Sequence, residues 1–386
     1  MGIKEIIKSN PFLYEIISAY LVRFDYGYLH SKGEIRRFLK TLKSEKKDCP
    51  YDPDKPDLYV IIGDKNQDST LRKAIFGDVD LGNCKEKCIF YTTRVLKDAR
   101  LTKLHRLYFR INKLIPLPLK KLWERAYTTD DLSAQNDYNM FVLFMAGAYY
   151  EETFSQPELL RRVHEFSEKT FCRKILYMVD PIDKYPNLPD WFPYFDFIAS
   201  YSREDEIKYN TVYIDSPCVH LPVKTNETEY DIYFRGMNAG RLEIIKKCYS
   251  HLAENGVSCS FHVQTGPKEA SFNTGLICSE ERVPYETMVV EETKANVLLE
   301  VLIPGVGSGP TLRSKEAVIY GKKLLTNNPW AVESEFYSSG NIRTFRSVED
   351  IDIDWIRDSK PVDYGYSGQF SCDEVFRKIK EMCLKE

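Results

Sequence analysis

Short apolar runs recur along the chain, and stretches with helical apolar spacing separate several of them. A short apolar run predicts a strand buried on both faces, as in a parallel sheet, and the amphipathic stretches predict the connecting helices. The pattern therefore predicts an α/β fold with right-handed crossovers. We expect strands at residues 58–63, 138–150, 173–179 and 195–202, and then at 231–235, 257–263, 296–303 and 322–326.

Several segments outside the strands predict how the domains are divided. Residues 1–45 have helical spacing and predict an N-terminal helical extension, whereas 66–83 is rich in turn-forming residues and predicts a loop. The polar stretch 218–229 predicts the boundary between two domains. Helices are expected at 157–170, 241–253, 284–294, 311–320 and 371–384. The predicted divisions are a first Rossmann-like domain at 1–222, a second at 223–345 and a C-terminal tail at 346–386.

The segment 294–328 combines a buried strand, a glycine-rich turn and a helix. Glycines at 305, 307 and 309 allow the backbone to turn tightly and to lie close to a ligand. Pro310 is expected in the first helical turn, where its missing N–H leaves no hydrogen bond unmade. Because free amides and the helix dipole face such a turn, the pattern indicates an anion site. The alternative is an ordinary strand–helix unit with glycines for packing.

This segment resembles the C-terminal half of bacterial GT-B-fold glycosyltransferases that build lipopolysaccharide, capsule or exopolysaccharide. The shared residues are Ser308, Gly309, Thr311, Arg313, Glu316, Ala317, Lys322, Lys323, Leu324, Thr326 and Asn327. The chain departs from the family pattern at Gly307 and Pro310. The resemblance implies that Glu316 holds the ribose of a nucleotide-sugar and that the turn faces its diphosphate. The broader pattern has a second glutamate eight residues earlier, where this chain has Ser308.

A basic segment at 100–125 contains a second passage, Pro116 to Trp123, that resembles the same family. Eight Lys and Arg residues mingle there with Leu, Ile, Phe and Trp, and between 101 and 125 the one acidic residue is Glu124. Such a segment predicts peripheral contact with an anionic membrane surface, near a lipid-linked acceptor. The alternative is a helix with a solvated basic face.

The start of the predicted second domain resembles the first strand, turn and helix of GT-B donor domains. On this resemblance Gly236 belongs to the donor-binding turn, Arg241 contacts the donor phosphates and Arg235 lies behind it. The helix dipole disfavours an arginine at a helix start, so a bound anion is favoured over a simple surface arginine. The resemblance also implies two Rossmann-like domains that face each other across a cleft (GT-B), with a C-terminal helix that crosses back onto the first.

Acidic residues supply the catalytic and metal-binding candidates. Glu151, Glu152 and Asp180 follow predicted strands, whose carboxyl ends line the ligand crevice of such a sheet. They are candidates for binding the acceptor or removing its proton, and capping of the next helix is the alternative. Asp78 and Asp80, if they lie on a strand edge, could instead share Mg²⁺ or Mn²⁺.

Composition narrows the class of protein. A net charge of −3 over 386 residues argues against a general nucleic-acid binder. The ten cysteines are scattered and the six histidines form no metal-binding motif, which favours reduced thiols in a cytosolic protein and no metal. No stretch approaches the roughly 18 apolar residues of a membrane span. Lys4 and Lys8 interrupt any signal-peptide core. We expect a cytoplasmic protein, with the basic segment at the inner face of the cytoplasmic membrane.

These observations predict a metal-independent hexosyltransferase that moves a sugar from a nucleotide-sugar donor to a growing surface glycan or lipid-linked acceptor, without a separate cofactor. The donor-binding candidates are Gly236, Arg241, Gly307, Ser308, Gly309, Thr311, Arg313 and Glu316. The alternatives are a metal-dependent GT-A-like or nucleotidyltransferase enzyme that uses Asp78 and Asp80, and a catalytically inactive GT-B scaffold. For the main prediction, Glu316→Ala should abolish a nucleotide-induced rise in melting temperature and leave the apo melting temperature nearly unchanged.

Overall fold

The chain forms two compact units, each assembled from segments that are distant in the sequence. The first comprises Met1–Lys65, Glu86–Ala199 and Met382–Glu386, and the second comprises Asn66–Lys85 and Ser200–Glu381. The computed structural model describes residues 32–42, 49–63, 70–92, 98–112, 135–146, 154, 157–185, 187–223, 227–266, 275–302 and 309–385.

Residues 200–222, which the sequence pattern places in the predicted first domain, group with the second unit. The N–H of Val219 donates to the carbonyl of Ala74 at 2.8 Å, in helix α4 (Thr70–Asp80). The N–H of Cys218 donates to the carbonyl of Phe370 at 2.8 Å, just before helix α14 (Cys372–Leu384). The polar stretch after residue 218 is therefore hydrogen-bonded to the second unit.

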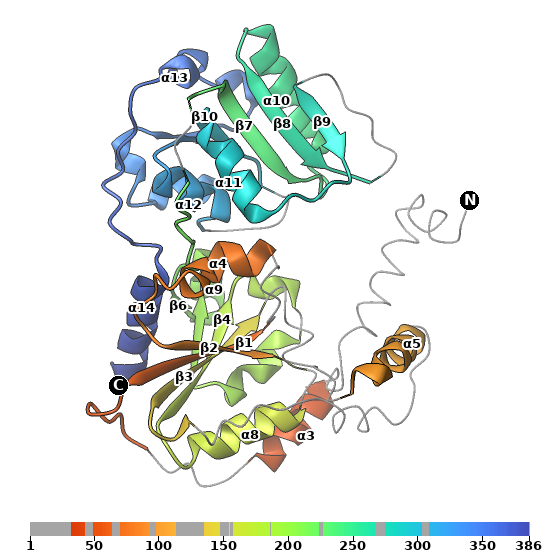
Figure 1. Cartoon of the computed structure of the whole chain (residues 1–386), viewed down its shortest axis with the longest axis vertical. Coiled ribbons are helices and arrows are strands. Elements are labelled where there is room, and N and C mark those ends of the chain that lie inside the picture. Colours follow the sequence, from red (N-terminus) through yellow and green to blue (C-terminus); the bar gives the residue numbers. More distant parts are fainter. Residues whose placement is uncertain are drawn as a thin grey trace. The chain divides into compact units, whose positions relative to one another are not determined.

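One six-stranded sheet has the order β2-β1-β3-β4-β5-β6. Figure 1 labels its strands β1, β2, β3, β4 and β6. Its strands β2, β1, β3 and β4 pair in parallel, with Ile61 opposite both Phe90 and Leu143. The predicted strands at 58–63, 138–150, 173–179 and 195–202 are confirmed, although their bounds differ: β1 begins one residue earlier than predicted, and β4 is shifted by one residue. The strands are β1 (Asp57–Gly63), β2 (Cys88–Thr92), β3 (Asn139–Ala146), β4 (Cys172–Met178), β5 (Phe197–Ser200) and β6 (Val212–Tyr213).

Helices of the first unit pack against this sheet through apolar faces. Leu160 and Val163 of α8 (Pro157–Ser167) are fully buried, as the amphipathic pattern predicts. Phe141 of β3 stacks on Tyr59 of β1 with ring centroids 5.1 Å apart. The other helices described in this unit are α3 (Lys32–Thr41) and α5 (Thr102–Asn112).

The second sheet has the order β12-β11-β10-β7-β8-β9, and all five strand pairs are parallel. Counted from β7, this is the Rossmann order, in which the chain changes direction between β7 and β10. The prediction of an α/β fold with two Rossmann-like sheets is confirmed, whereas the predicted cleft stays a prediction. The strands are β7 (Tyr230–Met237), β8 (Cys259–Gln264), β9 (Leu276–Ser279), β10 (Ala295–Glu300), β11 (Lys323–Thr326) and β12 (Ile342–Thr344).

Two hydrophobic cores cover the second sheet. In one, Ile245 and Leu252 of α10 (Leu242–Glu254) and Ile356 of α13 (Ile353–Arg357) pack with β7, β8 and β10. In the other, Ala317 and Val318 of α12 (Leu312–Ile319) pack with β10 and β11. A smaller cluster joins α11 (Tyr285–Thr293) to α4. The remaining helix described in this unit is α9 (Arg203–Tyr209).

The prediction that residues 66–83 form a loop is wrong, because Thr70–Asp80 is the helix α4. Its glycine and aspartates suggested turns, but Ala74, Ile75 and Phe76 are buried, and this tertiary packing outweighs local propensity. The sequence pattern did not predict the strands β2, β6, β9 and β12.

All ten cysteines lie in the described ranges, and all are free thiols. Among the helices that the structure describes, none combines the length and apolarity needed to cross a bilayer.

Candidate functional site

A cavity of about 450 Å³ opens at the carboxyl ends of β7, β8 and β9. Sheets of this topology bind ligands outside their carboxyl ends, beside the point where the strand order reverses. The volume suits a small-molecule ligand. Guanidinium groups outnumber carboxylates in its lining, which favours an anionic ligand. The charged lining residues are Arg235, Arg241, Arg282, Arg313, Glu281 and Glu316.

A second cavity, of about 240 Å³, adjoins the first. Both are lined by Arg235, Arg241, Leu312 and Arg313, so these residues stand between a larger and a smaller space. The smaller cavity is also lined by Glu300, at the carboxyl end of β10. A ligand with an anionic centre and two neutral ends would fit this arrangement.

Arg241 bridges the ends of the two strands at the switch point. Its Nε donates to the carbonyl of Met237 at 2.9 Å, and its Nη1 donates to the carbonyl of Val301. A Cβ at Gly236 would lie 2.6 Å from its Nη2, so a glycine there leaves room for the guanidinium. Burial lowers the pKa of Arg241, and the charge of Arg313 lowers it further. An anion beside both arginines would oppose these effects.

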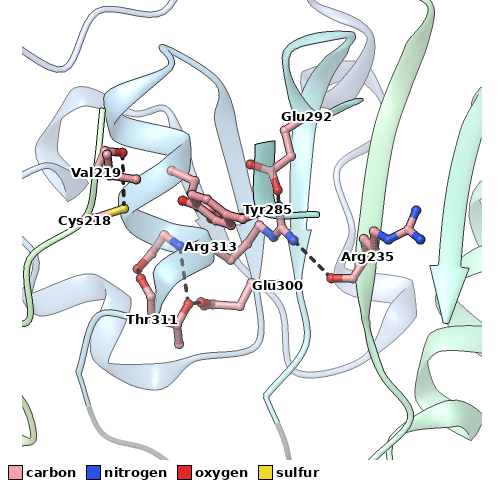
Figure 2. A network of polar contacts seen from close by, with 10 residues as sticks. Cys218, Val219, Arg235, Tyr285, Glu292, Glu300, Thr311 and Arg313 are labelled. Carbon is pink, nitrogen blue, oxygen red and sulfur yellow. Dashed lines mark hydrogen bonds and ion pairs between the residues drawn. The ribbon is translucent and has the colours of Figure 1, made fainter. Parts of the chain in front are cut away.

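Arg313 of α12 cross-links three elements of the second unit (Figure 2). Its Nη1 donates to Glu292 of α11 and lies 3.3 Å from Oε2 of Glu316. Its Nη2 donates to the carbonyl of Arg235 in β7 at 3.0 Å. The hydroxyl of Tyr285 donates to Oε1 of Glu316 at 2.9 Å. A buried charge is tolerated when it is paired and hydrogen-bonded, so this network is a structural requirement as well as part of the cavity wall.

Glu300 fixes the start of α12. Its two carboxylate oxygens accept hydrogen bonds from the hydroxyls of Thr311 and Thr326. Thr311 is the N-cap of α12, and its Oγ1 accepts a bond from the N–H of Ser314 at 3.4 Å. The prediction that Pro310 occupies the first helical turn is therefore wrong, since it precedes the cap. Burial raises the pKa of Glu300, whereas the two hydroxyl donors lower it.

The residues at the two ends of the glycine-rich turn are hydrogen-bonded to Asn327 and Asn328, which directly follow β11. The N–H of Leu302 donates to Oδ1 of Asn327 at 2.7 Å, and Nδ2 of Asn328 donates to the carbonyl of Gly309 at 3.0 Å. Gly309 has φ of 124°, a conformation that favours glycine, and an added Cβ would overlap the carbonyl oxygen of Tyr201. The side chains of Asn327 and Asn328 therefore hold Leu302 and Gly309, one on each side of the turn.

Of the remaining predicted site residues, one lies in the described part of the chain and four lie outside it. Asp180 follows β4 as predicted, but its carboxylate accepts bonds from Nζ of Lys184 at 2.7 Å and from the hydroxyl of Tyr185 at 3.2 Å. Asp180 does not cap the following helical turn, whose N-cap is Pro181 without a side-chain hydrogen bond. Its catalytic role stays a prediction. Four further candidates lie outside the described residues, and their roles also stay predictions: Glu151, Glu152, Gly307 and Ser308.

Asp78 and Asp80 do not lie on a strand edge, as the metal-site alternative required, but in the helix α4. Asp80 pairs with Arg72 at 2.6 Å. Asp78 is buried, which raises its pKa, and accepts backbone N–H bonds from His220 and Cys372. Both carboxylates therefore have structural partners. In the part of the chain that the structure describes, no three His, Cys, Asp or Glu side chains converge as a metal site.

Several residues of the site did not emerge from the sequence pattern. Glu292 follows Tyr285 and Val289 by seven and three positions, which places it on the buried face of α11. A charged residue on an apolar helix face signals a buried partner. Glu300 is the last residue of the apolar strand β10, and nothing in the sequence pattern around it indicates a buried partner. Arg282 and His262 also line the larger cavity.

No protein-family model matches the chain, and no curated protein sequence matches it. Solved structures are similar to it at low identity. A UDP-GlcNAc 2-epimerase from Methanocaldococcus jannaschii, in complex with UDP-GlcNAc and UDP, is 10% identical over 86% of this chain and 100% of its own, with a TM-score of 0.42. An α,α-trehalose-phosphate synthase (UDP-forming) from Burkholderia vietnamiensis is 10% identical over 84% and 96%, with a TM-score of 0.42.

Replacing Gly309 by alanine should destabilise the second unit. The added Cβ would meet the backbone of Tyr201 in a conformation that alanine rarely adopts, so we expect a loss of about 1–3 kcal/mol in the free energy of unfolding. Gly340→Ala is the matched control, because Gly340 also has positive φ, of 74°, but has no atom within 4 Å of an added Cβ. Urea denaturation measures both. Equal losses in the two variants would contradict the close approach to Tyr201.

Glu316→Ala should lower the stability of the apo protein, which corrects the expectation of a nearly unchanged melting temperature. The truncation leaves the Tyr285 hydroxyl without its acceptor and takes one carboxylate from Arg313, all in a buried network. We expect a loss of about 3–5 kcal/mol by urea denaturation. Glu243→Ala, at a well-exposed position of α10, is the control and should change stability little. An unchanged midpoint for Glu316→Ala would show that the network contributes nothing to stability.

Proposed function

We propose that this chain is a glycosyltransferase, of the hexosyltransferase type, that moves a sugar from a nucleotide-sugar to a growing surface glycan or lipid-linked acceptor. The observation that carries the proposal is the gathering of four arginines around a cavity of about 450 Å³ beside the switch point of a Rossmann-ordered sheet. The resemblance of residues 308–327 to GT-B enzymes points to the same ligand class.

The two adjoining cavities suggest how the donor would lie. The nucleoside would occupy the larger cavity, between the ends of β8 and β9 and the start of α11. The diphosphate would lie at Arg241 and Arg313, which line both cavities. The sugar would then extend toward the smaller cavity, beside Glu300.

Glu316 can hold a ribose hydroxyl without leaving its present partners. An ionised carboxylate offers about four acceptor positions, and Tyr285 and Arg313 occupy only part of them. Because the residue lines the larger cavity, the remaining capacity would serve the ligand.

Transfer requires stabilisation of the negative charge that grows on the leaving diphosphate while the sugar carbon becomes cation-like. Fixed positive groups aimed at that charge stabilise the transition state more than the bound substrate. In our proposal Arg241 and the amides at the start of α12 supply this field without a metal ion. An acidic residue of the first unit would bind the acceptor or remove its proton.

The alternative functions have separate tests. A metal-dependent enzyme would lose transfer activity in EDTA, whereas the proposed enzyme would keep it. An inactive scaffold would bind nucleotides without transferring or hydrolysing any sugar from a panel of nucleotide-sugars. Two departures from the family pattern favour this scaffold alternative, namely Gly307 in place of a glutamine and Ser308 in place of a glutamate.

A thermal-shift screen with UDP, GDP, CMP and dTDP should reveal at least one stabilising nucleotide, because a ligand of the native state raises its melting temperature. Arg241→Ala should weaken that binding about 10- to 100-fold, the loss typical of a hydrogen bond to a charged group. Arg346→Ala, which removes the same charge at an exposed position, should bind like the wild type. If no nucleotide shifts the melting temperature, or if both variants bind equally, the proposed donor site is wrong.

Helix α5 supports the membrane-contact part of the proposal. Leu104, Leu107 and Ile111 are exposed on one helical face, with side-chain spacing of three and four residues. Lys103 is exposed beside them. An apolar stripe flanked by basic residues is typical of a helix that lies in a membrane interface.

The double variant Leu104→Asp/Leu107→Asp should bind vesicles that contain phosphatidylglycerol at least about tenfold more weakly, since each leucine would bury apolar area in the interface and each aspartate would be repelled. Vesicle sedimentation measures the difference. Ile207→Asp is the control, because Ile207 is 80% exposed on α9 of the second unit. Membrane contact through α5 would be refuted if the wild type did not sediment, or if the double variant and the control sedimented alike.

A further inference from the structure

Three charged side chains meet inside the second unit, and two of them are acidic. Glu292 is fully buried, and the side chains of Arg313 and Glu316 are 11% and 2% exposed. Oε1 of Glu292 accepts a bond from Arg313. Oε2 of Glu292, also buried, finds no hydrogen-bond donor among the described residues. One guanidinium therefore faces two carboxylates, and one carboxylate oxygen is left unsatisfied.

The other groups around Glu292 do not balance the second carboxylate. Tyr285 is neutral, because burial raises its pKa, and it donates to Glu316. Burial also raises the pKa values of Tyr233, Cys218 and Tyr320, which face the cluster from β7, the 218 segment and the end of α12. Lys322 donates to the carbonyl of Thr293 at 2.7 Å, at the end of α11. The immediate positive partner of Glu292 in the network is thus Arg313.

Two carboxylates in one buried site resist ionising together. Burial raises the pKa of Glu292; Arg313 lowers it and Glu316 raises it again. Both carboxylates meet the same nitrogen, because Nη1 of Arg313 donates to Oε1 of Glu292 and lies 3.3 Å from Oε2 of Glu316. A proton held between the two would satisfy the orphan oxygen and leave the cluster neutral.

We propose that Glu292 and Glu316 share one proton, and that binding of a nucleoside diphosphate at Arg313 is linked to the retention of this proton. Glu292 is then a positioning residue, which acts through Arg313 and touches no substrate. The inference rests on the proposed donor site and adds a regulatory property to it.

The direction of the linkage follows from charge. With the shared proton, the cluster carries one positive and one negative charge and is neutral; without it, the net charge is −1. A diphosphate at Arg313 is repelled by the second state, so it binds the protonated cluster more tightly. At any pH at which the free protein has partly lost the shared proton, nucleotide binding therefore takes up a proton from solvent onto a carboxylate oxygen. Affinity should fall as pH rises on the alkaline side of neutrality, because burial raises the pKa of Glu292.

Isothermal titration calorimetry with UDP, GDP and dTDP tests this linkage. Titrations at pH 8 in HEPES and in Tris, which differ in ionisation enthalpy, report the protons taken up. We expect the wild type to take up a larger fraction of a proton per nucleotide than Glu292→Gln, which keeps the size of the side chain and cannot titrate. Glu291→Gln is the matched control in the same helix, because Glu291 pairs with Lys294 instead. It should behave like the wild type.

Stability without nucleotide provides a second, independent readout. The unfolded chain releases the glutamate proton near pH 4.3, whereas the native state keeps it to higher pH. The native state then binds more protons, so the free energy of unfolding of the wild type should fall relative to that of Glu292→Gln as pH rises from 5 to 8. Urea denaturation at both pH values measures this difference and also reports whether the variant is folded.

The outcomes separate the inference from the proposed function. If UDP, GDP or dTDP binds the wild type with the same proton uptake and pH dependence as Glu292→Gln, the linkage is overturned while the donor site stands. If the stability difference does not change between pH 5 and pH 8, there is no shared proton, and the inference is again overturned. If none of the three nucleotides binds the wild type but CMP does, the linkage to a diphosphate is overturned while the donor site stands. If CMP does not bind either, the donor site and the linkage both fail.

Discussion

Arg313 carries its charge into the interior of the second unit, where its side chain is only 11% exposed, and the elements around it must therefore supply most of its acceptors. Glu292 of α11, Glu316 of α12 itself and the carbonyl of Arg235 in β7 fulfil this requirement. Removing any one of them leaves a charge or donor unpaired, which is the costly state of a buried ion pair. The guanidinium thus fixes the relative positions of two helices and the central strand, and the cavity wall follows from these positions.

A second constraint operates at the carboxyl end of β10. The Glu300 carboxylate accepts hydrogen bonds from the hydroxyls of Thr311 and Thr326, so the N-cap of α12 and the end of β11 are held to the same strand end. Asn327 and Asn328 then bond the residues on each side of the glycine-rich turn. The start of α12 is consequently presented to the smaller cavity by a rigid frame, which is what electrostatic stabilisation of a leaving group requires.

Much of this arrangement could be predicted from sequence, because the buried strands are nearly continuous apolar runs and the glycine turn has a distinctive spacing. The run 296–303 and the stop at Gly321 located β10 and the end of α12 within a few residues. The helix α4 could not be predicted, since its Gly-Asp-Val-Asp end resembles a turn and its burial depends on contacts with residues over a hundred positions away. Arg241, Arg313 and Glu316 were recognisable as site candidates, but the role of Glu300 depends on a threonine from another strand.

The two central arginines have different electrostatic surroundings, and this difference bears on their chemistry. Arg313 is matched by two carboxylates, so its charge is largely balanced within the protein. The hydrogen bonds described for Arg241 go to two backbone carbonyls, which are dipoles without net charge. Its pKa is lowered by burial and by Arg313, so this guanidinium is destabilised by its surroundings. An anion bound beside both arginines would be stabilised mainly by the charge of Arg241. The charge of Arg313 would stabilise the anion only to the extent that Glu292 or Glu316 is protonated. If the donor and the shared proton are as proposed, the field available to a leaving diphosphate would depend on the fixed charge of Arg241 and on Arg313, whose net contribution would vary with a single proton.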